Sequence, residues 1–195
     1  MAYTSCAAEL AANINPNCAT PNVGGYTGRA ILIPCSINPT ITKSGTNPRI
    51  VSDIALESGD KVCVVDNAMP VNPFAGSTTT MSTDNGWASY AKSLAIRIPM
   101  RGAGVAKDVV EPLVDSPLGV IAIVEKKFKG GDGSFEIMGL EAGMKATEES
   151  RDESANNGDW SATLSTSERF AEYTLFDTDY ATTLAKFEAL WAKAL

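Results

Sequence analysis

Histidine is absent from all 195 residues of this chain. Because histidine is the usual general base near neutral pH, the common catalytic dyads and triads cannot be assembled here. No Cys-x-x-Cys pair occurs, so a zinc site would need all four cysteines at irregular spacing. We therefore expect no catalytic residue, no metal site and no cofactor, and we interpret the chain as a non-enzyme.

Basic residues are scarce and hydrophobic runs are short. The chain has 16 Lys and Arg against 23 Asp and Glu, a formal charge of −7, which argues against a protein that grips nucleic acid along its length. The longest apolar run, Leu118–Val124, is far shorter than the ~20 residues of a membrane-spanning helix. No signal-peptide pattern opens the sequence, so we expect no membrane insertion.

Short alternating strands, separated by turn residues, are abundant. Apolar and polar residues alternate in Lys92–Met100 and in Trp160–Ser165, as expected for half-buried strands. The glycine-rich turn at 129–133 predicts a hairpin between Leu118–Phe128 and Ser134–Leu140. Further strands are expected at Arg29–Cys35, Arg49–Leu56, Lys61–Met69, Ala142–Ala146 and Phe170–Phe176, with Glu57–Asp60 joining the second and third of these as a hairpin and 148–159 as a solvated loop.

Two segments have the apolar spacing of helices. Val105–Leu113 carries a valine-rich stripe, and Pro112 is expected to end or kink that helix at Glu111. A terminal helix is predicted from Asp179, its N-cap, to Leu195, because its aromatic and leucine side chains recur on one face. These helices are too few for a doubly wound parallel sheet.

The segment Pro70–Tyr90 differs from the rest of the chain. It is rich in Thr, Ser, Gly and Asn, and no Lys or Arg occurs between Lys61 and Lys92. We interpret it as an extended hairpin or long loop, with Ser77–Thr83 able to form a strand. An exposed, pairing-competent arm is an aggregation hazard unless a partner receives it. The arm is therefore predicted to contact another subunit.

Together these elements predict a mainly β (α+β) fold. Residues 1–28 are expected to form an irregular N-terminal segment, and residues 29–195 a single antiparallel β-sandwich or partly closed barrel. That domain would carry a flanking mid-chain helix, the polar arm at 70–90 and a C-terminal helix. The candidate subunit-interface residues lie in the N-terminal segment and in the arm: Tyr3, Leu10, Ile14, Ser77, Thr78, Thr79, Thr80, Met81, Trp87 and Tyr90.

Several motifs have a simpler structural interpretation. Gly102–Lys107 follows a strand and opens a helix but lacks the third glycine of a dinucleotide-binding turn. The carboxylates between Glu148 and Glu153 are interpreted as a solvated charge cluster rather than a catalytic pair. Trp87 and Tyr90 are suited either to stacking a sugar or neighbouring subunit, or to packing at the base of the arm.

The order of these elements resembles the tail tube, or major tail, proteins of tailed bacteriophages. The resemblance lies in the irregular start, the sandwich, the arm at Pro70–Tyr90 and the helix at Val105–Leu113. The stretch Phe135–Lys145, followed by the polar loop and Trp160–Leu164, is similar to structural proteins of phages that infect Bacteroidetes-type hosts.

This resemblance implies a virion protein made in the host cytoplasm. In that family, subunits form rings, usually hexamers, that stack into a hollow tube through which phage DNA passes without specific binding. The inner sheets of neighbouring subunits join, arms and N-terminal segments lock successive rings, and the lumen is acidic. The implied partners are copies of the same chain and other virion proteins. Deleting Gly76–Gly86 is expected to leave a folded monomer that does not assemble.

Three other interpretations remain open. The first is a non-catalytic, monomeric β-sandwich module that binds a glycan through Trp87 and Tyr90. The second is another head–tail connector or capsid-associated structural protein. The third is an enzyme that uses carboxylates alone, which would need a deep cleft with two facing Asp or Glu side chains.

Overall fold

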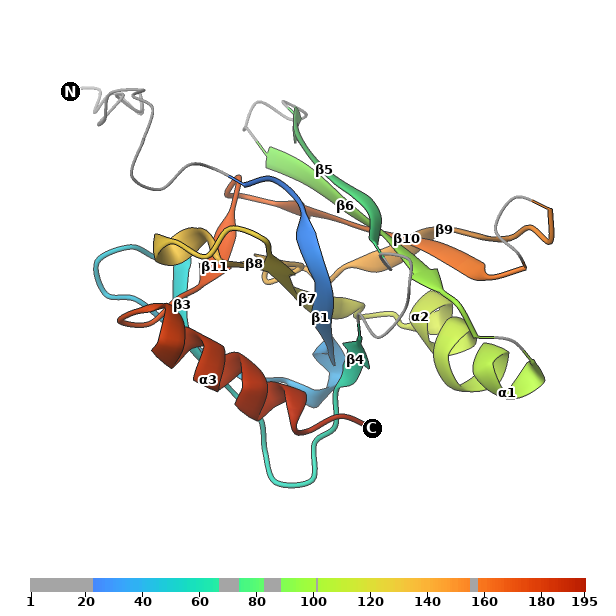
Figure 1. The fold of residues 1–195 in the computed structure, drawn as a ribbon, viewed down its shortest axis with the longest axis horizontal. Coiled ribbons are helices and arrows are strands. Elements are labelled where there is room, and N and C mark those ends of the chain that lie inside the picture. Colours follow the sequence, from blue (N-terminus) through green and yellow to red (C-terminus); the bar gives the residue numbers. More distant parts are fainter. Residues whose placement is uncertain (1–22, 67–73, 83–88, 101, 155–157) are drawn as a thin grey trace, which may run out of the picture.

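The fold is mainly β, as predicted, and consists of two sheets and two helical regions (Figure 1). The computed structural model describes residues 23–66, 74–82, 89–100, 102–154 and 158–195. Within these residues neither sheet closes on itself, so the sandwich form of the prediction is confirmed and the barrel form is not.

The larger sheet has seven strands in the order β2-β3-β11-β8-β7-β1-β4. All its neighbours are antiparallel except β3 and β11, which are parallel. Its strands are β1 (Tyr26–Pro34), β2 (Thr40–Lys43), β3 (Ile50–Ala55), β4 (Cys63–Val65), β7 (Val120–Lys126), β8 (Phe135–Met138) and β11 (Tyr173–Leu175).

The centre of the large sheet is buried on both faces. Along β1, Ala30 and Leu32 enter the core between the two sheets, while Ile31 and Ile33 enter a second core on the opposite face. Strand β7 has the same property, with every residue from Val120 to Glu125 buried. Two-sided burial explains why these strands are nearly continuous apolar runs rather than alternating ones.

Helix α3 (Tyr180–Trp191) covers the outer face of the large sheet, as Figure 1 shows. Phe187 and Leu190 are buried in the second core. The helix begins as predicted, because Asp179 Oδ1 accepts a hydrogen bond from the Thr182 backbone N–H at 2.7 Å. Arg29 joins β1 to this helix through an ion pair of 2.6 Å with Glu188.

The smaller sheet has four strands, all antiparallel, in the order β5-β6-β10-β9. They are β5 (Phe74–Ser82), β6 (Ser89–Ile98), β10 (Trp160–Glu168) and β9 (Lys145–Arg151). Leu94 and Ile96 of β6 and Leu164 of β10 face the large sheet and fill the first core. The residues between them point away, so this sheet has the alternating pattern of one-sided burial.

The mid-chain helix runs through Pro112, so of the two predicted outcomes at Glu111, an end or a kink, the end is wrong. It consists of α1 (Ala103–Val105), a π-helical turn (Ala106–Val110) and α2 (Glu111–Asp115). The Glu111 N–H bonds to the carbonyl oxygen of Ala106, five residues earlier. Pro112 then occupies the first turn of α2, where a missing N–H carries little penalty.

Two further strand predictions are wrong. Glu57–Asp60 does not form a hairpin turn, because β3 lies between β2 and β11 while β4 pairs with β1 at the far edge. The predicted loop at 148–159 begins too early, since β9 extends to Arg151 and pairs with β10. An edge strand open to water tolerates the charges that suggested a loop.

The connection between the two sheets depends on close backbone contact. Val120 and Met144 exchange two backbone hydrogen bonds of 2.9 and 2.7 Å. Gly119 and Gly143 lie beside this bridge with φ of +74° and +70°. A Cβ atom at Gly119 would lie 2.4 Å from the Met144 oxygen, and one at Gly143 would lie 2.1 Å from the Leu118 oxygen. Glycine is therefore required at both positions.

Candidate assembly surfaces

The outward side of the small sheet is a surface of small polar side chains, here called the hydroxyl face. The strand register places Thr78, Ser93 and Ser165 side by side in one row across three strands. Thr78 and Ser93 share a hydrogen bond of 2.8 Å, and Ser150 and Ser161 share another of 2.8 Å. The members of this face are exposed or half-exposed: Thr78, Thr80, Ser93, Ser150, Ser161, Thr163, Ser165 and Ser167.

The small sheet ends in two long edge strands. Strand β5 has nine residues and pairs only with β6, and β9 has seven residues and pairs only with β10. Among the described residues no further strand continues the sheet at either edge. Ser77–Met81 on β5 are exposed, and most of β9 is exposed as well. Edges of this length present backbone N–H and C=O groups that another strand can pair with.

Tyr26 fixes β5 to the large sheet. Its hydroxyl lies 2.6 Å from Ser77 Oγ and donates to Glu136 Oε2 at 3.2 Å, and its ring packs edge-on against Phe74. Burial raises the pKa of Tyr26 to about 12, and the nearby Glu136 carboxylate adds to the rise. Lys126 pairs with Glu136 at 3.1 Å and so balances its charge. These contacts hold the Phe74–Ser77 end of β5 against the large sheet, whereas Thr78–Met81 beyond it are exposed on both sides of the strand.

A buried ion pair lies between the sheets. Lys92 of β6 and Glu168 of β10 are paired, and neither side chain is exposed to solvent. Glu168 Oε1 also accepts the Leu140 backbone N–H at 2.7 Å, and the Lys92 ammonium lies 5.4 Å from the centre of the Tyr173 ring. Burying two charges is costly, so this pair adds specificity to the strand register more readily than net stability.

A second charged cluster joins α3 to the large sheet. Glu125 is 4% exposed and bonds to Thr27 Oγ1 at 2.8 Å, to Lys129 and, at 3.6 Å, to Arg29. Burial raises the pKa of Glu125, but the hydrogen bonds and positive charges outweigh burial and lower the pKa overall. This cluster is a structural clamp, because each charge in it has a partner.

The structure separates the predicted interface residues by direction. Along β5, Thr78 and Thr80 point outward with the hydroxyl face, whereas Ser77 and Thr79 share the inward side with Leu94 and Lys92. Tyr90 lies on that same inward side, opposite Met81 and Glu168. Met81 is 64% exposed. The remaining candidates lie outside the described residues: Tyr3, Leu10, Ile14 and Trp87.

Sequence reasoning missed three functional features. Tyr26 was placed in the irregular segment 1–28, although β1 begins there. Lys92 and Glu168 each end an alternating apolar series, on β6 and β10, and that position is a signal that could have revealed them. The strand predicted at Ala142–Ala146 covers only the first two residues of the edge strand β9, because the charged residues that follow are typical of a loop.

The described part of the chain holds no group of three Asp, Glu, Cys or His side chains arranged for a metal ion. Cys35 and Cys63 are free thiols, and burial raises the pKa of both. Cys6 and Cys18 lie outside the described residues. Among the helices described, none combines the length and hydrophobicity needed to cross a bilayer.

Comparison with protein-family models, with curated proteins and with solved structures finds no match to this chain.

Proposed function

We propose that this protein is a self-assembling virion structural protein, a ring or tube subunit of a phage tail. The observation that carries the proposal is the four-stranded sheet with two long edge strands. Each edge is suited to receive a strand from a neighbouring copy, and two different edges give a head-to-tail contact that repeats from copy to copy.

The strand directions support such a ring. Because the sheet has four antiparallel strands, β5 and β9 run in opposite directions. When β9 of one copy lies beside β5 of the next in the same orientation, the new pair is also antiparallel. The same hydrogen-bond pattern then continues around the whole ring, and a closed ring leaves no free edge.

The hydroxyl face lines the lumen in this arrangement. Barrels of about 16 strands or more enclose a water-filled channel, so a ring of four or more copies has one. The register also places Lys145 and Glu148 of β9 on this face, opposite Ser165 and Thr163. Its one arginine, Arg97, is paired with Asp159 at 2.9 Å, so the basic side chains do not form a cluster. A wall of small hydroxyl groups without a basic patch favours the passage of DNA rather than its binding.

Proline substitutions on β5 test the proposal. In an antiparallel edge strand, successive N–H groups point alternately to the partner strand and to the open edge. Of Thr79→Pro and Thr80→Pro, one therefore breaks a bond to β6 and the other removes only an edge donor. The variant that keeps the wild-type unfolding free energy should fail to form rings or tubes in negative-stain electron microscopy.

The matched pair Glu149→Pro and Ser150→Pro applies the same test to β9. Rings formed by the fully folded proline variants would refute the edge contact, as would wild-type protein that stays monomeric at high concentration. Deleting Gly76–Gly86 is a less clean test than the sequence suggested, because it removes most of β5 and the Ser77 contact with Tyr26.

The alternative of glycan binding needs two exposed aromatic side chains, Trp87 and Tyr90, and the position of Tyr90 does not support it. Tyr90 is half-buried on the inward side of β6 and is not part of the exposed face. A monomeric protein with saturable binding to a glycan array would support that alternative and contradict the ring.

A further inference from the structure

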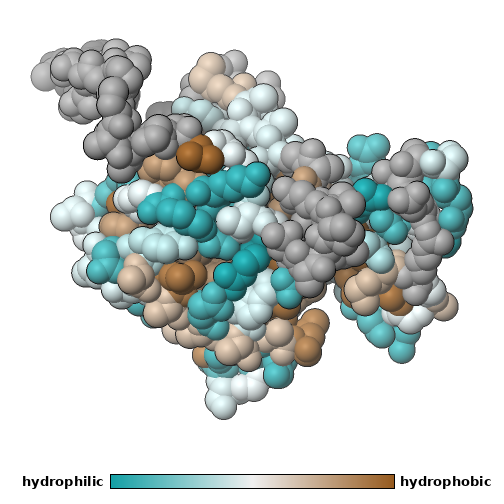
Figure 2. Space-filling model, viewed as in Figure 1, coloured by the Kyte–Doolittle hydropathy of each residue, from teal (hydrophilic) through white to brown (hydrophobic). Residues whose placement is uncertain are grey.

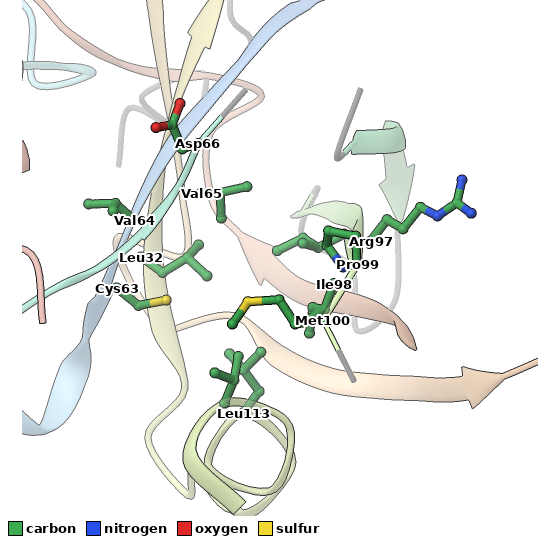
Figure 3. A pocket seen from close by; sticks show the side chains of 12 residues that line it. Leu32, Cys63, Val64, Val65, Asp66, Arg97, Ile98, Pro99, Met100 and Leu113 are labelled. Carbon is green, nitrogen blue, oxygen red and sulfur yellow. The ribbon is translucent and has the colours of Figure 1, made fainter. Parts of the chain in front are cut away.

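An apolar groove runs between strand β4, the end of β6 and the mid-chain helix. It consists of two adjoining cavities of about 350 and 360 Å³ that share Leu32, Cys63, Val109 and Leu113. Figure 3 shows Leu113 pointing up from the helix, while Leu32 and Cys63 approach from the large sheet and Met100 from the segment that follows β6. Arg97 points away from this space in the same view. The groove is distinct from the β5 and β9 edges.

The rim of the groove is unusually apolar. Met100, Leu118 and Leu195 are 54%, 55% and 86% exposed, and all three line the groove. They are half of the six large hydrophobic side chains that are exposed in the described chain. Elsewhere apolar side chains occur in small separate patches, as Figure 2 shows for the face that carries α3. A concentration of this kind marks a surface that binds another molecule.

Carboxylates surround this apolar surface. Asp66 lines one cavity, and Asp108 and Asp115 line the other. Within the described residues none of the three forms an ion pair, in contrast to the acidic side chains of the Glu125 cluster. The groove therefore combines apolar walls with unneutralised negative charge, and its complement combines apolar side chains with Lys or Arg.

We propose that this groove binds a polypeptide segment of a partner protein in which apolar side chains are flanked by Lys or Arg. The N-terminal segment of the chain itself is a poor match, because residues 1–22 contain Glu9 and no Lys or Arg. Strand β4 lies at the edge of the large sheet, and beyond Val62, whose backbone pairs with Lys193 and Leu195, this edge gives an extended segment backbone groups to pair with. This binding is separate from the proposed self-assembly, since the partner is a different protein and not another copy of this chain.

Protection of Cys63 tests this binding. The probe is a synthetic amphipathic peptide of Leu and Lys, and a peptide of Leu and Glu with the same pattern is its control. With the full chain, alkylation is followed site by site by mass spectrometry at a pH near 9, because burial raises the pKa of the Cys63 thiol. We expect the Leu/Lys peptide to slow alkylation of Cys63 at least fivefold and to leave Cys35, outside the groove, unaffected.

Charge variants distinguish binding of the Leu/Lys peptide at the groove from nonspecific attraction of a basic peptide to an acidic protein. Asp108→Asn/Asp115→Asn should weaken peptide binding about fivefold, in line with two exposed ion pairs. The matched pair Asp132→Asn/Glu148→Gln removes the same charge elsewhere and should leave binding unchanged. Equal effects of the two pairs, equal protection by the Leu/Glu peptide, or Cys63 protection that grows with protein concentration alone would overturn the proposal. The last outcome identifies a second copy as the occupant.

The edge variants on β5 keep the two proposals apart. A folded Thr79→Pro or Thr80→Pro protein that no longer forms rings should still show Cys63 protection by the Leu/Lys peptide. Loss of ring formation with intact protection supports both proposals, whereas ring formation without protection by the peptide contradicts the groove alone.

Discussion

The two sheets of this protein differ in how many of their faces are covered. The large sheet is covered on one face by the small sheet and on the other by α3, so its central strands are apolar on both sides. The small sheet is covered on one face only, and its other face carries hydroxyl groups. The comparison teaches that the large sheet is built into two cores, whereas the small sheet contributes to one core and leaves its other face uncovered within the described chain.

The largest effect is expected where the two sheets meet. Lys92→Met leaves Glu168 buried without its partner, which should lower the free energy of unfolding by about 3–5 kcal/mol. Urea denaturation followed by circular dichroism measures this loss. The double variant Lys92→Met/Glu168→Leu should recover much of the loss. A single variant as stable as the wild type would show that the pair is not buried as described.

A core position of the large sheet ranks next. Ile123 is fully buried beneath α3, and Ile123→Ala should cost about 2–5 kcal/mol because the removed side chain leaves a cavity. The same urea experiment applies. A cost below the range would mean that α3 does not seal this face, which would remove the contrast between the sheets.

The junction between β1 and β5 gives a pH-dependent effect. The pKa of Tyr26 is about 12 in the folded protein, above its ordinary value of 10.0, so the folded state favours the neutral phenol. Its contribution is complete below pH 10 and is lost as the pH rises from 10 towards 12. Tyr26→Phe should make stability less dependent on pH in this window. Some dependence remains, because burial also raises the pKa of Tyr173.

The smallest effect is expected on the hydroxyl face. Ser165→Ala and Thr163→Ala should each change the unfolding free energy by no more than about 0.5 kcal/mol, since these side chains support no core. The comparison with Ile123→Ala is direct, because both experiments use the same denaturation. A loss of more than 1 kcal/mol at either position, measured on unassembled protein, would indicate that this face is covered within the subunit.

Sequence patterns were most informative where strands are regular. The alternation in Trp160–Ser165 and Lys92–Met100 predicted β10 and β6, and the Gly-rich turn at 129–133 predicted the β7–β8 hairpin. The turn residues at Glu57–Asp60 led to a wrong hairpin prediction, because a turn signal does not show which strands are neighbours in the sheet. Strand β3 pairs instead with β11, which lies more than a hundred residues later in the chain.

The sequence could not predict which side chains of β5 face inward and which face outward. The register of β5 against β6 shifts between Phe74 and Gly76, and such a bulge changes which residues face inward. Ser77 consequently meets Tyr26, and Thr78 rather than Ser77 belongs to the hydroxyl face. Alternation alone cannot show this, because a one-residue shift exchanges the two sides of a strand.

The backbone bridge between Val120 and Met144 has a consequence for evolution. Side chains on either sheet can drift as long as their size and polarity are kept, but Gly119 and Gly143 have no substitute that fits. A distant homologue that has lost every other recognisable identity should still retain these two glycines, each beside a chain crossing from one layer to the other. They are the positions by which its ancestry could be traced.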